Sequence, residues 1–274
     1  MSAAPGSTRT RSPLRVFLTG ASSGIGVALA RHYARQGARL GLVARREAVL
    51  AALAEELSAL GAEVAIYPLD VTDVAALAAA GKDFIARFGA PEVVIANAGV
   101  SAGTLTEHAE DLAVFRRIVD TNLLGMAATF APFIAAMRDA VRTEGAGDFG
   151  RRLVGIASVA GIRGLPGAEA YSASKAAAIA YLESLRLEMR PDGIRVVTIA
   201  PGYIATPMTE INPYPMPFLV PADTAARRFA AAIARGTSYT VIPWQMGVVA
   251  RLLRAMPNWL YDRLFVGAPR KPRL

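Results

Sequence analysis

Apolar runs and helical apolar stripes alternate along most of the chain. Residues 14–19 form an apolar run that ends in a glycine-rich turn, and apolar side chains at helical spacing follow it. The same pattern then repeats, and the runs lack polar alternation, as in parallel strands that helices cover on both faces. Strands are expected at 38–44, 62–70, 92–99, 152–158, 194–202 and 238–244, and helices at 26–37, 47–60, up to 88, over 109–141 and at 169–189.

This alternation predicts one α/β domain, residues 14–242, with a doubly wound, Rossmann-type parallel sheet of six or seven strands flanked by helices. Residues 1–13 lack the apolar core of a signal peptide, so a flexible N-terminal arm and a cytoplasmic location are expected. The polar stretch 142–152 is expected to be an exposed loop. Residues 243–274 are expected to form a C-terminal helical extension with a basic tail.

Composition narrows the chemistry that this domain can perform. The 274 residues include no cysteine and only two histidines, which excludes disulfides and thiolate metal sites and disfavours a histidine-rich zinc site, so no metal is expected. The net charge is +8, but the arginines are scattered and no segment interleaves aromatic and basic residues. No nucleic-acid partner is therefore expected.

The loop at residues 19–26, TGASSGIG, lies where the first strand gives way to a helix. Glycines let the backbone approach a pyrophosphate, and the free N–H groups and positive dipole end of the helix favour that anion. The alternative is a tight turn with no ligand. The expected cofactor contacts in this loop are Gly20, Ser22, Ser23, Gly24, Ile25 and Gly26.

Two arginines, Arg45 and Arg46, follow the second strand, where a fold that prefers NAD carries an acidic residue for the ribose hydroxyls. They also begin a helix, where the macrodipole disfavours cations. A 2′-phosphate would remove that conflict by accepting charge-assisted hydrogen bonds, which favours NADP(H); the alternative is a solvated surface pair. After the third strand, Asp70 is placed to accept from the adenine amino group, and Thr72 reads equally well as a helix N-cap.

Tyr171 and Lys175 lie four residues apart on the predicted helix 169–189, so their side chains share one face. Lys175 is one of only three lysines among thirty basic residues. A nearby ammonium favours tyrosinate and brings the phenol toward neutral pH, and a compact lysine charge can also reach ribose hydroxyls. By itself this spacing arises often by chance, and an exposed pair is the alternative.

Six motifs in this order resemble the short-chain dehydrogenase/reductase family, over about residues 14–208. They are TGASSGIG at 19–26, ANAGV at 96–100, Asn122, IASVAG around Ser158, YSASK at 171–175 and PGYIATPM at 201–208.

The resemblance implies a role for each polar residue. Tyr171 would be the general acid or base, Ser158 would hydrogen-bond the substrate oxygen, and Lys175 would hold the nicotinamide ribose and lower the tyrosine pKa. Asn122 would anchor a water in the proton relay. Taken singly, Asn122 as a helix cap and Ser158 as a strand end remain alternatives. Further implied cofactor contacts are Asp70, Val71, Asn97, Ala98, Gly99, Tyr171, Lys175, Pro201, Gly202, Ile204 and Thr206, the last at the carboxamide.

The C-terminal extension departs from many family members, which stop soon after the last strand. Residues 245–265 carry an apolar helical stripe that is interrupted at Pro257 and interspersed with arginines, which excludes a transmembrane span. Contact with a membrane interface, a dimer or tetramer contact, and a cover for the substrate cleft all remain open. The ending resembles the extensions of members that act on steroids, retinoids or lipid ketones, and with the apolar segment 203–223 it implies a bulky apolar carbonyl substrate.

Two classes of function are therefore expected. The first is an NADP(H)-dependent oxidoreductase that interconverts a ketone or aldehyde and an alcohol, assembled as a homodimer or homotetramer. The alternative is a non-catalytic dinucleotide-binding sensor or scaffold of the same fold, which predicts a broken Tyr, Lys or Ser position. All three positions are intact, which favours the enzyme.

Overall fold

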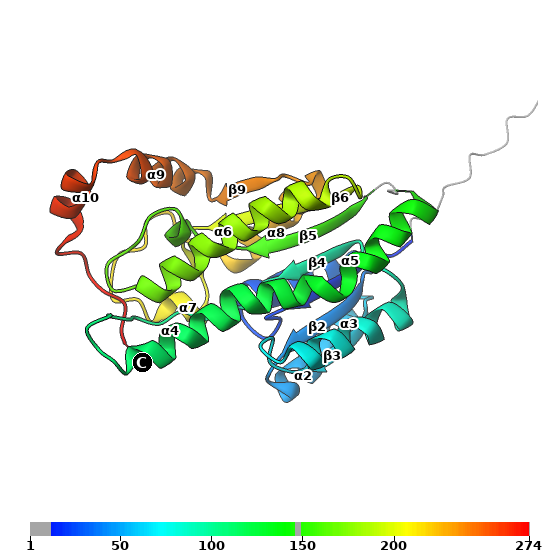
Figure 1. Cartoon of the computed structure of the whole chain (residues 1–274). Coiled ribbons are helices and arrows are strands. Elements are labelled where there is room, and N and C mark those ends of the chain that lie inside the picture. The colour runs from blue at the N-terminus through cyan, green and yellow to red at the C-terminus, as the bar shows by residue number, and fades with distance from the viewer. Residues whose placement is uncertain (1–11, 146–148, 274) are drawn as a thin grey trace, which may run out of the picture.

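The computed structural model describes residues 12–145 and 149–273 and contains a seven-stranded parallel sheet in the order β3-β2-β1-β4-β5-β6-β9 (Figure 1). The strand order reverses between β1 and β4, and the carboxyl ends of such strands border the crevice where doubly wound folds bind ligands. The predicted Rossmann-type sheet is confirmed. Its strands are β1 (Arg15–Thr19), β2 (Arg39–Ala44), β3 (Glu63–Pro68), β4 (Val93–Ala96), β5 (Arg151–Ile156), β6 (Ile194–Pro201) and β9 (Tyr239–Ile242).

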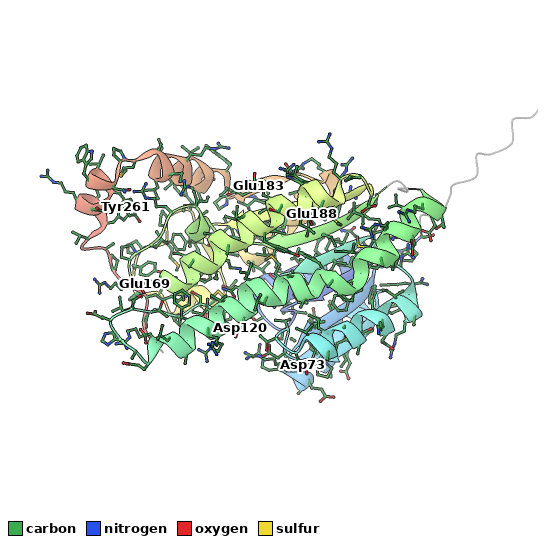
Figure 2. The ribbon with its side chains drawn as sticks, in the orientation of Figure 1. Asp73, Asp120, Glu169, Glu183, Glu188 and Tyr261 are labelled. Atoms are coloured by element: carbon green, nitrogen blue, oxygen red, sulfur yellow. The ribbon has the colours of Figure 1, made fainter. Side chains whose placement is uncertain are left out.

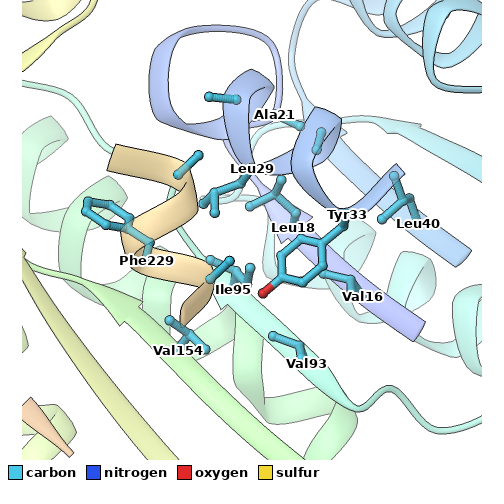
Figure 3. Close-up of a cluster of buried hydrophobic side chains, with 14 of the residues drawn as sticks. Val16, Leu18, Ala21, Leu29, Tyr33, Leu40, Val93, Ile95, Val154 and Phe229 are labelled. Carbon is cyan, nitrogen blue, oxygen red and sulfur yellow. The ribbon is translucent and has the colours of Figure 1, made fainter. Parts of the chain in front are cut away.

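Two apolar cores fill the space between the sheet and the helices on its two faces. On one face, Val16 and Leu18 of β1 pack in the same cluster as Phe229 (Figure 3), and on the opposite face Phe17 packs against Phe84. All five side chains are fully buried, and burying a side chain of this size contributes roughly 1.5–3 kcal/mol. Helices α1 (Gly24–Ala34), α2 (Glu47–Ala59) and α8 (Ala222–Arg235) cover the first face, and α3 (Val74–Phe88), α5 (Gly125–Glu144) and α6 (Glu169–Met189) cover the second.

The register of β1 sets the position of the crevice. Arg15 lies opposite Arg39 of β2, and Val16 lies opposite Val93 of β4, so the strands end together near Thr19. The loops that follow β1, β2 and β4 therefore emerge side by side at the carboxyl edge of the sheet.

The two helical stretches predicted over 109–141 are α4 (Asp111–Val119) and α5. A π-helical turn at Asp120–Leu124 joins them into one helical stretch from Asp111 to Glu144. By length and composition this stretch is apolar enough to cross a membrane, but half of its most apolar window is buried inside the fold, as in the core helix of an α/β domain. The π turn was not predicted.

The prediction of an exposed loop at 142–152 is confirmed in the exposure of residues 142–145 and is wrong at both ends in conformation, outside the undescribed residues 146–148. Helix α5 continues to Glu144, and β5 begins at Arg151, whose side chain is buried. The Arg151 guanidinium donates to Glu92 Oε1 at 2.8 Å and to Glu144 Oε2 at 2.9 Å. Arginine can be buried when its stem crosses apolar surface and its head meets carboxylates, and these partners are not evident from the local sequence.

The C-terminal extension contains two helices, α9 (Trp244–Ala255) and α10 (Asn258–Phe265), which separate at the expected Pro257. After α10 the chain runs back to the start of α4, where Arg273 contacts Asp111 (Figure 1). The predicted N-terminal arm falls almost entirely on residues 1–11, outside the described residues. Between β6 and α8 lie the short elements β7 (Ile204–Ala205), α7 (Pro207–Glu210) and β8 (Val220–Pro221).

Candidate active site

The glycine loop between β1 and α1 is shaped by close backbone approaches. Gly20 and Gly24 have φ angles of +69° and +51°, in the left-handed region that strains other residues. A Cβ on Gly26 would lie 2.0 Å from the Gly20 carbonyl oxygen, so Gly26 closes the loop on itself. Helix α1 starts without a side-chain cap and without an acid in its first turn, which leaves its positive end suited to an anionic ligand.

The end of β2 carries two arginines that turn toward different sides of the crevice. Arg46 Nη2 donates to the Ser22 carbonyl oxygen at 2.9 Å, which places it against the glycine loop. Arg45 Nη1 lies 3.6 Å from Asp70 Oδ2, and the Arg45 side chain is exposed. Both guanidinium groups therefore border the region where a ribose phosphate would carry its negative charge.

Asp70 is held as an acceptor at the end of β3. Burial acts to raise its pKa, but hydrogen bonds from Thr72 and the charge of Arg45 keep the pKa of this carboxyl below its ordinary value. Thr72 donates to Asp70 through its N–H and its hydroxyl, so it is not the N-cap of α3. Asp73 fills that position and accepts from the Ala76 N–H at 2.9 Å.

Asn97, at the end of β4, ties that strand to the glycine loop. Its Nδ2 donates to the Thr19 carbonyl oxygen at 3.0 Å, and its N–H donates to Thr19 Oγ1 at 3.1 Å. The N–H of Ala98 also donates to Thr19 Oγ1. Sequence reasoning did not assign Thr19 to the site, although it is the first residue of the glycine-loop motif at 19–26, and that position is the signal that would have found it.

Asn122 lies in the π turn of the long helix and is fully buried. Its Oδ1 accepts from the Val100 N–H at 2.8 Å, and its Nδ2 donates to the Val100 carbonyl oxygen and to Ser174 Oγ, each at 3.0 Å. The Ser174 hydroxyl in turn donates to the Tyr171 carbonyl oxygen at 2.8 Å. The π turn thus connects the loop after β4 to α6, in keeping with the frequent use of such turns at functional sites.

Tyr171 and Ser158 face each other across the cleft between α6 and the end of β5. Ser158 Oγ accepts from the Ala160 N–H at 3.1 Å, which fixes its position at the start of a short 3₁₀ turn. Tyr171 is half-buried, and burial raises its pKa, while its hydrogen bond with Ser158 acts to lower it. The net pKa of Tyr171 is above the ordinary value, and Lys175 is not among the groups that shift it, so the predicted lowering by Lys175 is not found in this arrangement.

Lys175 is a buried cation directed at the sheet edge. It is 4% exposed, and Nζ donates to the Ile156 carbonyl oxygen at 2.8 Å and lies 5.9 Å from the centre of the Tyr171 ring. Burial lowers the pKa of Lys175 to about 8. A Cβ on Gly99 would lie 3.6 Å from this Nζ and 3.2 Å from Asn122 Oδ1, so glycine keeps the backbone close to both groups.

A cavity of about 300 Å³ brings most of the sequence-predicted residues together. Two of them lie behind its wall, because Gly26 packs inside the loop and Asn122 supports the wall through Val100. Val100 and Met208 belong to the motifs read in the sequence but were not assigned to the site. Further lining residues that the sequence did not assign are Val43, Ala44, Leu69, Thr121, Ile156, Ala157, Pro207 and Thr209.

Comparison with known proteins agrees with this geometry. The sequence model of the short chain dehydrogenase family matches residues 15–213, from the first strand to the segment after β6. The chain belongs to the short-chain dehydrogenase family. Members of this family are oxidoreductases that bind a nicotinamide dinucleotide.

Relatives of this short-chain dehydrogenase cover nearly its full length. An uncharacterized oxidoreductase of Myxococcus xanthus is 39% identical over 246 residues, 90% of this chain and 94% of the relative. An 11-beta-hydroxysteroid dehydrogenase-like protein of Arabidopsis thaliana is 33% identical and covers 92% of this chain and 81% of its own. An alcohol dehydrogenase of Thermococcus sibiricus, solved with 5-hydroxy-NADP, is 27% identical with a TM-score of 0.72, covering 84% of this chain and 96% of its own.

The donor set of this short-chain dehydrogenase fits a dinucleotide. The uncapped start of α1 suits a pyrophosphate, the arginines after β2 supply positive charge at the ribose end, and Lys175 supplies a buried ammonium deeper in the cleft. Glycines stand at the points where the wall closes on itself, since Gly24 packs against the Thr206 side chain with no room for a Cβ. The cleft therefore has the charge and the backbone shape that such a ligand needs.

Proposed function

We propose that this short-chain dehydrogenase is an NADP(H)-dependent enzyme that interconverts a carbonyl group, in a ketone or aldehyde, and the corresponding alcohol. The observation that carries the proposal is the convergence of Ser158, Tyr171 and Lys175 on one cleft beside the glycine loop. These three groups form a hydroxyl pair with a buried ammonium, which is suited to proton transfer at an oxygen atom.

The preference for NADP(H) rests on charge. No acid stands at the end of β2, where a carboxylate would bind the free ribose hydroxyls, and Arg45 and Arg46 stand there instead. Guanidinium groups bind phosphate through charge-assisted hydrogen bonds, typically about twice as strong as neutral ones. When bound, the dinucleotide supplies or accepts the hydride, and the glycine loop holds its pyrophosphate.

Proton transfer belongs to Tyr171. In reduction the phenol donates its proton to the carbonyl oxygen, and in oxidation the phenolate removes the proton of the alcohol. Ser158 forms a hydrogen bond with Tyr171. Its hydroxyl group donates to the same substrate oxygen as Tyr171 while negative charge develops on that oxygen. Lys175 is placed to hold a ribose hydroxyl through its buried ammonium. Asn122 keeps this group rigid through Val100 and Ser174.

The proposed substrate is bulky and apolar. The segment that follows the cleft residue Thr206 exposes Met208, Ile211, Phe218 and Leu219. Apolar side chains exposed beside a cleft are typical of a pocket that buries an apolar ligand. The name of the Arabidopsis relative, 11-beta-hydroxysteroid dehydrogenase-like, points to the same class of substrate.

A comparison of the native enzyme with Tyr171→Phe tests the proposal. NADPH oxidation is followed with a panel of apolar ketones, and NADPH binding is measured separately by titration. Loss of the acid is expected to lower kcat by at least about a thousandfold while the NADPH dissociation constant changes less than about threefold. Undiminished turnover by Tyr171→Phe would remove the proposed proton donor. NADPH binding with no turnover of any carbonyl would favour the non-catalytic sensor or scaffold.

A further inference from the structure

The last described residues, 270–273, form a segment that we call the C-terminal strap. In Figure 1 it is the red coil that leaves α10 and ends beside α4. The Gly103 N–H donates to the Pro272 carbonyl oxygen at 2.9 Å, and the Arg273 guanidinium donates to Asp111 Oδ2 at 2.9 Å and to Glu110 Oε1 at 2.9 Å. The strap is therefore fixed on both its backbone and its side chains.

The loops beneath the strap have glycines where the strap touches them. A Cβ on Gly103 would lie 2.3 Å from the Lys271 carbonyl oxygen, and a Cβ on Gly167 would lie 2.8 Å from Arg270 Cβ. Gly103 has no positive φ angle. Glycine is therefore needed there because the strap backbone comes so close, and not because of the backbone conformation. These loops are thus shaped to receive the strap.

Lys271 joins two segments that border the substrate end of the cleft. Its Nζ donates to Ser101 Oγ at 2.9 Å and approaches the Met208 carbonyl oxygen at 3.5 Å. Val100, the neighbour of Ser101, lines the cleft from one side, and Met208 lines it as well. The ammonium thus connects the loop after β4 with the start of α7.

The charge of Lys271 is used differently from that of its neighbour Arg273. Arg273 has two carboxylate partners, whereas no ion pair within residues 12–145 and 149–273 includes Lys271. Lys271 is half-buried, and burial lowers its pKa. Partial burial of an ammonium group without a carboxylate partner costs free energy, because the charge loses water. The hydrogen bonds to Ser101 and Met208 offset this cost only while the strap stays in place.

The rest of the extension holds the strap against the same loops. The Tyr261 hydroxyl, on α10 (Figure 2), donates to the Gly164 carbonyl oxygen at 2.6 Å. Arg163 Nη1 donates to the Met256 carbonyl oxygen at 2.8 Å, and its guanidinium lies 4.2 Å from the centre of the Tyr261 ring. The loop that carries these partners leads into α6 and Tyr171.

We infer that Lys271 is a substrate-positioning residue, and that the strap is the part of the extension that fixes the width of the substrate end of the cleft. This inference rests on the proposed function. Because Lys271 holds the two lining segments together, its loss lets them separate and weakens the grip on the carbonyl substrate. Among the described residues, the hydrogen bonds of the strap go to residues 101–111 and 208 and to none in the loops after β1 and β2, so the dinucleotide end is unaffected.

Three variants, with two matched controls, test this role in the full-length protein. Lys271→Met and Gly103→Ala each displace the strap, and we expect KM for the carbonyl substrate to rise about fivefold to tenfold with kcat changed less than about twofold. The NADPH dissociation constant is expected to stay unchanged. Lys271→Arg, which keeps a donor, restores part of the loss. The matched controls are Lys82→Met, on the exposed surface of α3, and Gly164→Ala, where an added Cβ meets nothing within 4 Å.

Amide hydrogen exchange separates the fate of this inference from that of the proposed function. Lys271→Met and Gly103→Ala are expected to speed exchange in residues 100–104 and 207–210, and the two controls are not. An absence of turnover in the native protein contradicts the proposed function, and the exchange data still decide the role of the strap. Folded Lys271→Met and Gly103→Ala proteins with native exchange and native KM would overturn it.

An independent observation concerns the outer face of α9. Trp244, Val248 and Leu252 recur every four residues and are exposed, with Trp244 at 70% and Leu252 at 64%, while Met246 and Ala250 on the inner face are buried. Trp259 of α10 is also exposed, so both tryptophans of the chain lie on the surface of the extension. Tryptophan is large and apolar, and such exposure is typical of an interaction surface.

The positive charge of the extension indicates an anionic partner for this face. Residues 244–273 carry six basic side chains and a single acid, Asp262. We propose that the α9 outer face docks on an anionic lipid surface, with its apolar stripe in the interface and Arg251 at the headgroups. Arg254 stays against the domain, where its Nη1 donates to the Ile162 carbonyl oxygen at 3.3 Å. A second copy of the chain is disfavoured, because a symmetric contact of this face with itself would bring the two copies of Arg251 together.

Vesicle co-sedimentation tests the docking. The native protein is expected to bind vesicles of phosphatidylcholine mixed with phosphatidylglycerol, and not phosphatidylcholine alone. The double variant Trp244→Ser and Leu252→Ser is expected to lose at least about tenfold in affinity, since a buried apolar side chain contributes roughly 1.5–3 kcal/mol. Val74→Ser, on an equally exposed apolar residue of α3, is the control. Unchanged vesicle binding by the double variant, or a change in its oligomer mass without vesicle binding by the native protein, would overturn the proposal.

Discussion

Two arginine pairs at opposite edges of the sheet are alike in sequence and differ in use. Arg45 and Arg46 follow β2 at the carboxyl edge. The Arg45 side chain is exposed, and its Nη1 lies 3.6 Å from Asp70 Oδ2. Arg151 and Arg152 begin β5 at the amino edge and are 3% and 4% exposed. Arg152 donates from Nε to the Ile233 carbonyl oxygen at 2.6 Å, at the C-terminal end of α8.

The two arginine pairs differ in the groups that interact with their positive charge. At the amino edge, carboxylates and helix carbonyls of the protein itself already bind the guanidinium groups. At the carboxyl edge the charge of the arginines remains available to a ligand, and Lys175 remains buried without a carboxylate among its hydrogen-bond partners. The amino edge therefore stabilises the fold, while the carboxyl edge retains unbalanced positive charge for an anionic cofactor.

The largest expected effect on this comparison is at the amino edge. Arg151→Met leaves the Ala90 carbonyl oxygen without its partner and removes one of the two arginines that bind Glu92, and we expect the free energy of unfolding to fall by roughly 2–4 kcal/mol. Urea denaturation measures this loss, and NADPH affinity of the folded variant is expected to be native. Arg142→Met, at an exposed arginine, serves as the control and is expected to change stability by less than about 0.5 kcal/mol. Equal stability of the two variants would contradict the structural role of Arg151.

An intermediate effect is expected at the carboxyl edge. Arg45→Asp places a negative charge beside the ribose phosphate, and we expect NADPH affinity to fall by about tenfold to a hundredfold and NADH affinity by less than about threefold. Parallel titrations with both cofactors measure the difference. Equal losses for the two cofactors would show that Arg45 does not bind a 2′-phosphate.

A smaller effect concerns the stability that the protein loses by burying the protonated Lys175. The folded-state pKa of Lys175 is about 8, below its ordinary value. The loss of stability is therefore complete below pH 8 and disappears as the pH rises toward the pKa of the unfolded state. At pH 7 the free energy of unfolding of Lys175→Met is therefore expected to exceed that of the native protein by roughly 1–3 kcal/mol. The variant is expected to have no catalytic turnover.

Denaturation at several pH values checks this expectation. The stability difference between the native protein and Lys175→Met should narrow between pH 8 and about pH 10.5. A difference that stays constant over this interval would show that Lys175 is not a buried, uncompensated cation.

The sequence predicts the carboxyl edge better than the amino edge, for a physical reason. Residues such as Gly20 and Lys175 lie in short motifs whose spacing fixes their relative positions within one loop or one helix. The buried partners of Arg151 and Arg152 lie about 60 and 80 residues away along the chain, as the pairs with Glu92 and Ile233 show. Local charge therefore indicated a solvated loop where long-range pairing buries the side chains.

Two helical features also escaped prediction. Helix α8 was not predicted, although its buried residues, among them Ala225, Phe229 and Ile233, recur at helical spacing and are the signal that would have found it. The π turn at Asp120–Leu124 depends on the three hydrogen bonds of Asn122 to other elements. Neither the width of a turn nor those partners can be derived from apolar periodicity. The order of cofactor loops, in contrast, follows directly from the strand and helix alternation.

A side-by-side calorimetric titration of the native protein with NADPH and NADH tests the central claim most directly. Arg45 and Arg46 at the carboxyl edge predict tight binding of NADPH and binding of NADH that is weaker by at least about tenfold, the difference made by a charge-assisted phosphate contact. Equal affinity for the two cofactors, or tighter binding of NADH, would contradict the assignment of Arg45 and Arg46 to a 2′-phosphate.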